Sequence, residues 1–242
     1  MATDTEAGKK GAMGGWKAAL AAGVVGALIG AGAMAAASGS LVRHYLLEYP
    51  EVIPEAMQRL RDRETAQVLS QNRAAFETPF AGAWAGAKDG DVVLVEFFDY
   101  ACGYCRKSNA DVDRLLAEDR KLKVVWREWP VLGPDSEAAA QVSLAVAKAG
   151  RFKPFHDALF ASGRPSPAAV DRALQAAGVR PDAVAQAKGS QAAAQELSRN
   201  YQLASAVRGT GTPVFVVGDR VLHGAVGYDV LKEAVAEARR RG

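Results

Sequence analysis

The sequence predicts an α/β fold in which a long helical stretch is inserted into a strand-containing domain. Residues 92–98 form a near-continuous apolar and aromatic run, which is typical of a strand buried on both faces of a sheet. A helical pattern follows over residues 106–117, and a second strand-like run follows at residues 122–129. After an alanine-rich helical stretch over residues 135–206, strand character returns with residues 213–217.

The remaining elements complete this domain. A turn at residues 218–220 leads into a short apolar run at residues 221–224, so the two runs around it predict a β-hairpin. A last helix is predicted over residues 228–240. Glycine and proline predict breaks in the inserted helical stretch at Gly150, residues 163–167, residues 178–181 and Gly189. We therefore expect the domain to span residues 90–242.

The N-terminal part of the chain is predicted to be separate from this domain. Residues 18–37 carry no charge and are rich in alanine and glycine, and 20 residues can just cross a bilayer core of about 30 Å. Three lysines precede them, which favours a cytoplasmic tail over residues 1–17. Two interpretations stay open: an uncleaved transmembrane anchor, or a signal peptide cut near the small residues 35–37. Either one places the following part of the chain outside the cytoplasm.

Residues 41–80 are predicted to form an N-terminal helical segment. Apolar residues recur near helical spacing, and two prolines divide the pattern into a short helix and a longer one over about 52–76. A narrow apolar stripe on a charged helix either lies against its own domain or packs against copies of itself. A homo-oligomer, dimer or trimer, formed through residues 41–78 is therefore one of two open interpretations. Proline and glycine over residues 79–90 predict a linker into the next domain.

Composition excludes several classes of function. The net charge is only +3, and three of the positive charges are the arginines at 239–241, so no broad basic face remains for a nucleic-acid backbone. The chain has two cysteines, which cannot build a framework of several disulfides or a four-cysteine zinc site. We expect no nucleic-acid partner, no bound metal and no cofactor.

The two cysteines, Cys102 and Cys105, form a Cys-x-x-Cys pair directly after the first predicted strand. A strand, this pair and then a helix are typical of a redox-active site. Three other interpretations were weighed. A zinc site would need two more ligands from three widely spaced histidines, and a c-type haem site needs histidine where Arg106 stands. The third, an inert structural bridge, stays open, but the context favours redox chemistry.

Two stretches of the sequence resemble the DsbA-like family of envelope thiol:disulfide oxidoreductases. They are the run from Glu96 to Cys105 and the run from Gly211 to Tyr228. Within that family, residues 42–60 resemble the N-terminal segment of the ScsC and Com-like branch. The resemblance covers about residues 41–242. It implies a thioredoxin-like fold with an inserted helical domain, an oxidising bacterial compartment, and, for some members of the branch, trimers formed through the N-terminal helices.

The resemblance also implies roles for the cysteine pair. Cys102, at the start of a helix where free N–H groups stabilise a thiolate, would be the nucleophile. Cys105 would be the resolving thiol that forms a disulfide with Cys102 and releases the substrate. Gly103 and Tyr104 would tune the redox poise. The Cys-Gly-Tyr-Cys sequence resembles disulfide isomerases more than the strongly oxidising DsbA.

Three further residues complete the site that the resemblance implies. Pro213 would be a cis-proline facing the cysteines, although a bare Xaa-Pro bond is cis in only about 5–6% of cases. It would expose the backbone of Thr212 for pairing with substrate. Glu96 stands in an apolar strand six residues before Cys102, and in the family the matching acid assists proton transfer from the buried thiol. The other interpretation of Glu96 is a solvated position at the edge of the sheet.

The sequence therefore predicts a thiol:disulfide oxidoreductase that acts on cysteine-containing envelope proteins together with a membrane redox partner. A disulfide isomerase or reductase is the first choice, and a DsbA-like oxidase is the alternative. A module that binds copper(I) through both thiolates is the alternative from another class. We expect an inner-membrane anchor with the catalytic domain in the periplasm, or a periplasmic protein after signal cleavage.

Overall fold

The computed structural model describes residues 41–185 and 189–241, together with Gly23 and Gly39. The predicted cytoplasmic tail and, apart from Gly23, the predicted anchor or signal segment over residues 18–37 lie outside these residues. Within the described part of the chain, no helix is both long enough and apolar enough to cross a membrane.

The chain divides into two compact units, Met1–Arg59 and Leu60–Gly242. In the first unit residues 41–48 are helical, and after a break at residues 49–51 helix α2 (Val52–Gln71) begins and continues into the second unit. Several large apolar side chains of the first unit are exposed, namely Leu41, Val42, Leu47, Ile53 and Met57.

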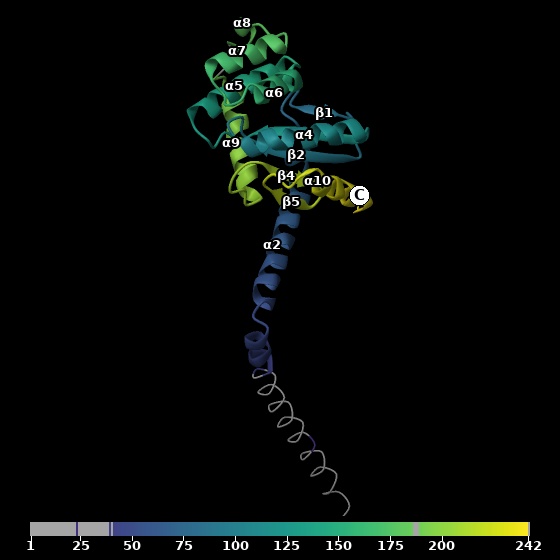
Figure 1. The fold of residues 1–242 in the computed structure, drawn as a ribbon. Helices are drawn as coiled ribbons and strands as arrows, with labels where there is room; N and C mark the ends of the chain where they lie inside the picture. The colour runs from purple at the N-terminus through teal and green to yellow at the C-terminus, as the bar shows by residue number, and fades with distance from the viewer. Residues whose placement is uncertain (1–22, 24–38, 40, 186–188, 242) are drawn as a thin grey trace, which may run out of the picture. The chain divides into compact units, whose positions relative to one another are not determined.

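The second unit is built on a five-stranded mixed sheet in the order β1-β3-β2-β4-β5 (Figure 1). The strands are β1 (Trp84–Gly86), β2 (Val92–Phe98), β3 (Leu122–Glu128), β4 (Val214–Val217) and β5 (Arg220–His223). Strands β2 and β3 run parallel, whereas the other neighbouring pairs are antiparallel. Strand β2 lies in the middle of the sheet and is buried, which confirms the buried strand predicted over residues 92–98.

Helices cover both faces of this sheet. One face carries α4 (Gly103–Glu118) and α10 (Tyr228–Arg241), and the other carries α3 (Arg73–Glu77) and α9 (Gln191–Ala206). The inserted helical stretch consists of α5 (Pro134–Lys148), α6 (Phe152–Ala161), α7 (Pro167–Ala176), α8 (Pro181–Ala185) and α9. Figure 1 shows α5, α6, α7 and α8 gathered together. This arrangement confirms the predicted thioredoxin-like α/β fold with an inserted helical part.

The predicted breaks in the helical stretch fall where helices end. Gly150, Gly163 and Gly178 follow α5, α6 and α7 at short distance, with φ of +69°, +90° and +68°. Glycine adopts this left-handed conformation without the steric penalty of a Cβ, so it ends a helix and redirects the chain. The ends of these helices therefore follow from signals that are local in the sequence.

Residues 79–90 are more than the predicted linker. Strand β1 forms within them and pairs antiparallel with β3, so the sheet begins before residue 90. A strand of three residues is too short to show a period-two pattern in the sequence. At Gly86 a Cβ would lie 2.3 Å from the carbonyl oxygen of Leu122. The glycine that suggested a loop thus permits a close approach of two strands.

The longer N-terminal helix ends earlier than the sequence predicts. Helix α2 ends at Gln71, and Asn72 separates it from α3, whereas one helix over about 52–76 was expected. Leu69 and Phe76 are buried against the sheet, and the Phe76 ring lies edge-on to Phe97 with 6.2 Å between centroids. In this part of the predicted 41–80 segment, these two apolar side chains therefore pack against the chain's own domain.

Alternation along β2 decides which of its side chains face helix α4. Leu94 and Phe98 pack in the cluster that contains α4 and α10, whereas Val95 and Phe97 pack in the cluster on the opposite face. Because successive strand residues point to opposite faces, Glu96 lies on the same face as α4. The strand thereby places a carboxyl group beneath the helix that carries the cysteines.

A buried arginine ties the opposite face together. Arg127 on β3 donates hydrogen bonds to the carbonyl oxygens of Ala75 (2.6 Å), Phe76 (2.9 Å) and Thr78 (2.8 Å), to Glu196 Oε1 (3.0 Å) and to Asn200 Oδ1 (2.9 Å). The carbonyl groups at the end of α3, which have no partner within the helix, are thus satisfied by a side chain from the sheet. This contact holds α3 and α9 in place behind β3.

Candidate active site

The two cysteines lie at the N-terminus of α4. Cys102 immediately precedes the helix, and Cys105 lies within its first turn. Both are free thiols in this structure. Cys102 keeps 6% of its surface exposed, whereas Cys105 is fully buried. Between them, a Cβ at Gly103 would meet open space, and Tyr104 is 69% exposed. Cys102 is therefore the sulfur that another molecule can reach.

Cys102 lies against the segment that leads into β4. Its Sγ donates a hydrogen bond to the carbonyl oxygen of Thr212, with 3.3 Å between the atoms. The peptide bond between Thr212 and Pro213 is cis, as the sequence predicts. The fold therefore brings together two motifs that lie 110 positions apart in the chain.

The surroundings of Cys102 favour its thiolate. The hydrogen bond with the Cys105 thiol lowers the pKa of Cys102 most, and the Thr212 side chain and the N–H groups of Cys105 and Tyr104 lower it further, while burial opposes them. Together they move the pKa of Cys102 from an ordinary 9.0 to about 5. At neutral pH Cys102 is therefore mostly a thiolate, the form that attacks disulfides.

Cys105 behaves in the opposite way. Burial raises the pKa of Cys105 far above its ordinary value, and the hydrogen bond with Cys102 and the charge of Glu96 raise it further. Cys105 therefore stays protonated while Cys102 is ionised, and its S–H can donate to the Cys102 thiolate. The different surroundings of the two cysteines thus make Cys102 the nucleophile and keep Cys105 as a protonated thiol.

Glu96 is buried and has one hydrogen-bond partner in the described part of the chain. Its surface is 1% exposed, and Trp126 Nε1 donates to Glu96 Oε2 over 3.1 Å. Burial raises the pKa of Glu96 to about 8, against the effect of the Trp126 bond. The interpretation of Glu96 as a solvated edge position is wrong, because β2 is paired on both sides. A carboxyl group with a pKa near neutral can both accept and donate a proton.

We expect the reduced protein to gain stability relative to the oxidised protein as the pH rises from about 5 to 9.0. The pKa of Cys102 is lower in the folded reduced protein than in the unfolded chain. The Cys102 thiolate therefore stabilises the reduced protein fully above pH 9.0, the pKa in the unfolded chain. This stabilisation is lost as the pH falls through about 5, the pKa in the folded protein. In the oxidised protein Cys102 does not titrate. Urea unfolding of both redox forms across this pH range measures the difference.

The variant Glu96→Gln is the control for this experiment. The pKa of Glu96 rises from 4.5 to about 8 on folding, so its contribution is present below pH 4.5 and is lost as the pH rises through 8. This trend opposes that of Cys102 and occurs in both redox forms. Glu96→Gln should remove it from both and leave the difference between them. If the free energies of unfolding of the reduced and the oxidised forms changed with pH in parallel, the lowered pKa of Cys102 would be contradicted.

Sequence reasoning missed one residue of this site, Asp99. Its buried carboxylate accepts four hydrogen bonds: at Oδ1 from Ala101 N (2.7 Å) and Ser136 Oγ (2.6 Å), and at Oδ2 from Val131 N (2.8 Å) and Leu132 N (2.9 Å). The carbonyl oxygen of Asp99 also accepts from Cys102 N over 3.0 Å. The available signal was a carboxylate among apolar residues, three positions before Cys102.

The structure places His156, one of the three histidines, in the core. It lies among aromatic rings and shares hydrogen bonds with Asn109 Oδ1 (3.2 Å) and the Tyr100 hydroxyl (3.3 Å). Burial lowers the pKa of His156 well below its ordinary value, so it stays neutral. His156 is therefore part of the aromatic core and not of the cysteine site.

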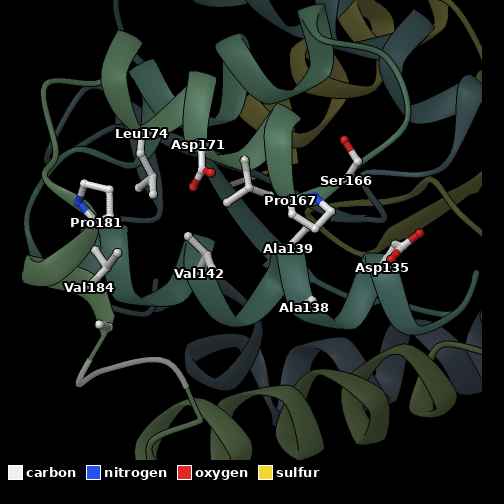
Figure 2. Close-up of a pocket in the computed structure, with 12 residues that line it drawn as sticks. Asp135, Ala138, Ala139, Val142, Ser166, Pro167, Asp171, Leu174, Pro181 and Val184 are labelled. Atoms are coloured by element: carbon white, nitrogen blue, oxygen red, sulfur yellow. The ribbon is translucent and has the colours of Figure 1, made fainter.

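A separate pocket of about 270 Å³ lies in the inserted helical part. Figure 2 shows Val142, Leu174 and Val184 from α5, α7 and α8 on its walls, with the carboxylates of Asp135 and Asp171 nearby. None of its lining residues is a cysteine or a histidine. Among the described residues, no cluster of three or more histidine, cysteine, aspartate or glutamate side chains could hold a metal ion.

Residues 93–236 match the DSBA-like thioredoxin domain, which is more than half of the chain. The chain belongs to this family. Residues 36–67 also match the N-terminal domain of the copper resistance protein ScsC. Both matches confirm the resemblance found in the sequence. With the cysteine pair at the start of α4, they place the chain among proteins of the DsbA and ScsC type.

Solved structures agree with this assignment. A thioredoxin-like oxidoreductase from Silicibacter pomeroyi DSS-3 is 36% identical, with a TM-score of 0.67 over 70% of this chain and 98% of that one. A linker-deletion variant of Proteus mirabilis ScsC is 28% identical, with a TM-score of 0.70 over 84% and 93%. The thiol-disulfide exchange protein α-DsbA2 from Wolbachia pipientis is 26% identical, with a TM-score of 0.68 over 74% and 97%.

The curated relatives are much longer proteins. A Na(+)/H(+) antiporter, NhaA 3, from Salinispora tropica is 28% identical over 156 residues, which are 63% of this chain and 24% of the antiporter. The chain spans about a quarter of the length of the curated relatives that it matches. These matches therefore concern a part of each antiporter.

Proposed function

We propose that this protein is a disulfide isomerase or reductase for cysteine-containing exported proteins, with Cys102 as nucleophile and Cys105 as resolving thiol. The observation that carries the proposal is the placement of an accessible, readily ionised Cys102 opposite the Thr212 carbonyl and the cis-proline Pro213. An isomerase or reductase must attack existing disulfides, and a stable thiolate at neutral pH serves that step.

The proposed reaction begins when the Cys102 thiolate attacks one sulfur of a substrate disulfide. The substrate S–S bond breaks, a mixed disulfide with Cys102 forms, and the other substrate sulfur leaves as a thiolate. In isomerisation, a substrate thiolate then attacks the mixed disulfide and regenerates Cys102 without net oxidation. In reduction, Cys105 attacks Cys102 Sγ, the substrate leaves reduced, and the Cys102–Cys105 disulfide forms, consuming two electrons from the enzyme.

Glu96 is proposed as the group that exchanges the proton of Cys105. Cys105 must lose its proton before it can attack, and its burial opposes ionisation. The carboxyl group of Glu96 lies on the same face of the sheet as α4 and has a pKa of about 8. The variant Glu96→Gln should therefore slow the reductive step by about tenfold or more. Unchanged kinetics from pH 6 to pH 9 would remove Glu96 from the mechanism.

Substrate is proposed to bind as an extended chain beside Thr212 and Pro213. The Thr212 carbonyl oxygen lies 3.3 Å from Cys102 Sγ, so the backbone of Thr212 faces the reacting sulfur. The loop after β3 adds two exposed apolar side chains, Val131 (40%) and Leu132 (49%), and the Asp99 carboxylate ties this loop to the turn before Cys102. Gly103 and Tyr104 are proposed to set the redox poise from the exposed side.

The reduction potential of the Cys102–Cys105 pair decides between the two main activities. We expect the potential, measured against glutathione with the full chain, to lie closer to that of protein disulfide isomerase, about −180 mV, than to that of DsbA, about −120 mV. Refolding of scrambled ribonuclease should accompany it. A potential near that of DsbA, with activity only in oxidising reduced substrates, would support the oxidase and contradict this proposal.

We also propose a periplasmic site of action and a membrane redox partner that keeps the pair reduced. The uncharged stretch over residues 18–37 supports export, whether it is an anchor or a cleaved signal.

The exposed apolar side chains of the first unit, such as Leu47 and Met57, support self-association of this part of the predicted 41–78 segment as a dimer or trimer. Light scattering of Leu47→Glu, which should dissociate the oligomer, tests this.

A further inference from the structure

The Asp99 carboxylate connects three segments around the catalytic cysteine. Ala101 belongs to the turn before Cys102, Val131 and Leu132 belong to the loop after β3, and Ser136 lies in the first turn of α5. These groups lie 2, 32, 33 and 37 positions from Asp99 in the chain. One side chain therefore sets the spacing between the cysteine turn, an apolar loop and the start of the helical insertion.

The bonding pattern requires a carboxylate. All four groups that point at Asp99 are donors, two on each oxygen, and Asp99 is 1% exposed. An ionised carboxylate accepts at both oxygens, and such charge-assisted bonds are short and directional. An asparagine side chain has one oxygen and one NH₂ group in place of the two oxygens. In one orientation the NH₂ group would face the N–H of Ala101, and in the other it would face those of Val131 and Leu132, so a donor would meet a donor in both.

The loop after β3 is held by its backbone while its side chains face solvent. Val131 and Leu132 donate their N–H groups to Asp99, and the hydroxyl of Tyr201 on α9 donates to the carbonyl oxygen of Pro130. The side chains of Val131 and Leu132 stay exposed. A backbone fixed from two sides, with apolar side chains directed outward, is a rigid surface beside the cysteine turn.

We propose that Asp99 is a positioning residue for thiol–disulfide exchange. It fixes the position of the Val131–Leu132 loop relative to the Cys102 turn, so that a protein substrate bound to the loop meets the sulfur of Cys102. This proposal rests on the proposed function, because it requires Cys102 to be the nucleophile. Asp99 does not touch the reacting atoms. It acts through the two segments that its carboxylate joins.

The test compares a protein substrate with a small disulfide that needs no docking surface. For Asp99→Asn we expect kcat/KM for insulin to fall about ten- to a hundredfold, since small displacements of a reacting pair cost factors of this size. The rate with glutathione disulfide should fall only a few fold. Asp135→Asn, an exposed aspartate at the start of α5, is the matched control and should change neither rate.

A double-variant cycle shows whether Asp99 acts through the loop. Leu132→Ala should lower kcat/KM for insulin in the unmodified protein, and in the Asp99→Asn background it should have little additional effect, because the loop is no longer held in register. Full additivity of the two changes, or equal losses with insulin and glutathione disulfide, would overturn the proposal. If the unmodified protein and Cys102→Ser react alike with glutathione disulfide, the proposed function itself fails.

A second variant keeps the test decisive if Asp99→Asn does not fold. Ser136→Ala removes one of the four donors and leaves the three backbone N–H groups on the carboxylate. We expect a loss of the same kind, about threefold with insulin and none with glutathione disulfide, because Oδ1 keeps only one of its two hydrogen bonds, the one from Ala101 N. No selective loss in a folded Ser136→Ala protein would then overturn the proposal.

Discussion

Replacement of Cys102 by serine will lower thiol–disulfide exchange by more than about a thousandfold, as removal of a catalytic nucleophile generally does. A serine hydroxyl is not ionised at neutral pH, whereas the surroundings of Cys102 bring the pKa of its thiol to about 5. Replacement of Cys105 by serine will instead leave the attacking thiolate and remove the group that releases substrate. Cys105→Ser should therefore accumulate mixed disulfides with protein substrates, detectable on non-reducing gels.

The control for this prediction asks whether any exposed thiol would serve. The chain has no third cysteine, so no other thiol can take over in Cys102→Ser. In the double variant Cys102→Ser with Ser198→Cys, a thiol stands on an exposed position of α9. Without the helix N-terminus and the Cys105 donor it should keep an ordinary pKa and restore no activity. Recovery of activity there would show that the position of Cys102 is unimportant.

Replacement of Arg127 by methionine will lower the free energy of unfolding by about 3–5 kcal/mol, the range measured when one partner of a buried ion pair is removed. The change leaves Glu196 without its cation and leaves the carbonyl groups at the end of α3 without their donor. Both groups are deep behind the sheet, where unmet hydrogen-bonding groups are costly. Denaturant unfolding of the oxidised protein measures the loss.

Two further variants separate the charge pair from the carbonyl contacts. Glu196→Gln keeps the other four acceptors of Arg127, so we expect it to cost less than Arg127→Met. Arg172→Met, an exposed arginine on α7, should stay within about 0.5 kcal/mol of the unmodified protein. Equal stability of Arg127→Met and Arg172→Met would mean that the buried network contributes nothing.

Much of the fold was predictable because its signals are local. The apolar run of β2, the glycines that end α5 to α7 and the hairpin turn each depend on residues that are neighbours in the chain. Strand β1 escaped prediction because three residues carry no measurable period, and because its partner β3 lies far along the chain. The end of α2 at Gln71 was also not predicted, and the segment that follows packs Phe76 against Phe97, which lies in another element of the chain.

The candidate site shows the same division. Cys102, Cys105 and the cis bond at Pro213 were expected from the sequence, and the structure places Cys102 and Thr212 in contact. Asp99 was missed because its four donors come from three segments, which no sequence pattern joins. The partner of Glu96 was missed as well, because Trp126 is its neighbour only across the β2–β3 pairing.

The sequence by itself determined which side chains can react. It also determined the order of the strands and helices along the chain. A thiol's capacity for exchange and the periodicity of strands and helices are properties of residues and their near neighbours. Only the tertiary structure decided that Cys102 ionises while Cys105 stays protonated, and that Glu96 titrates near neutral pH. Such differences depend on burial and on hydrogen bonds, some of them from residues distant in the chain, such as Thr212 and Trp126, and the fold alone provides both.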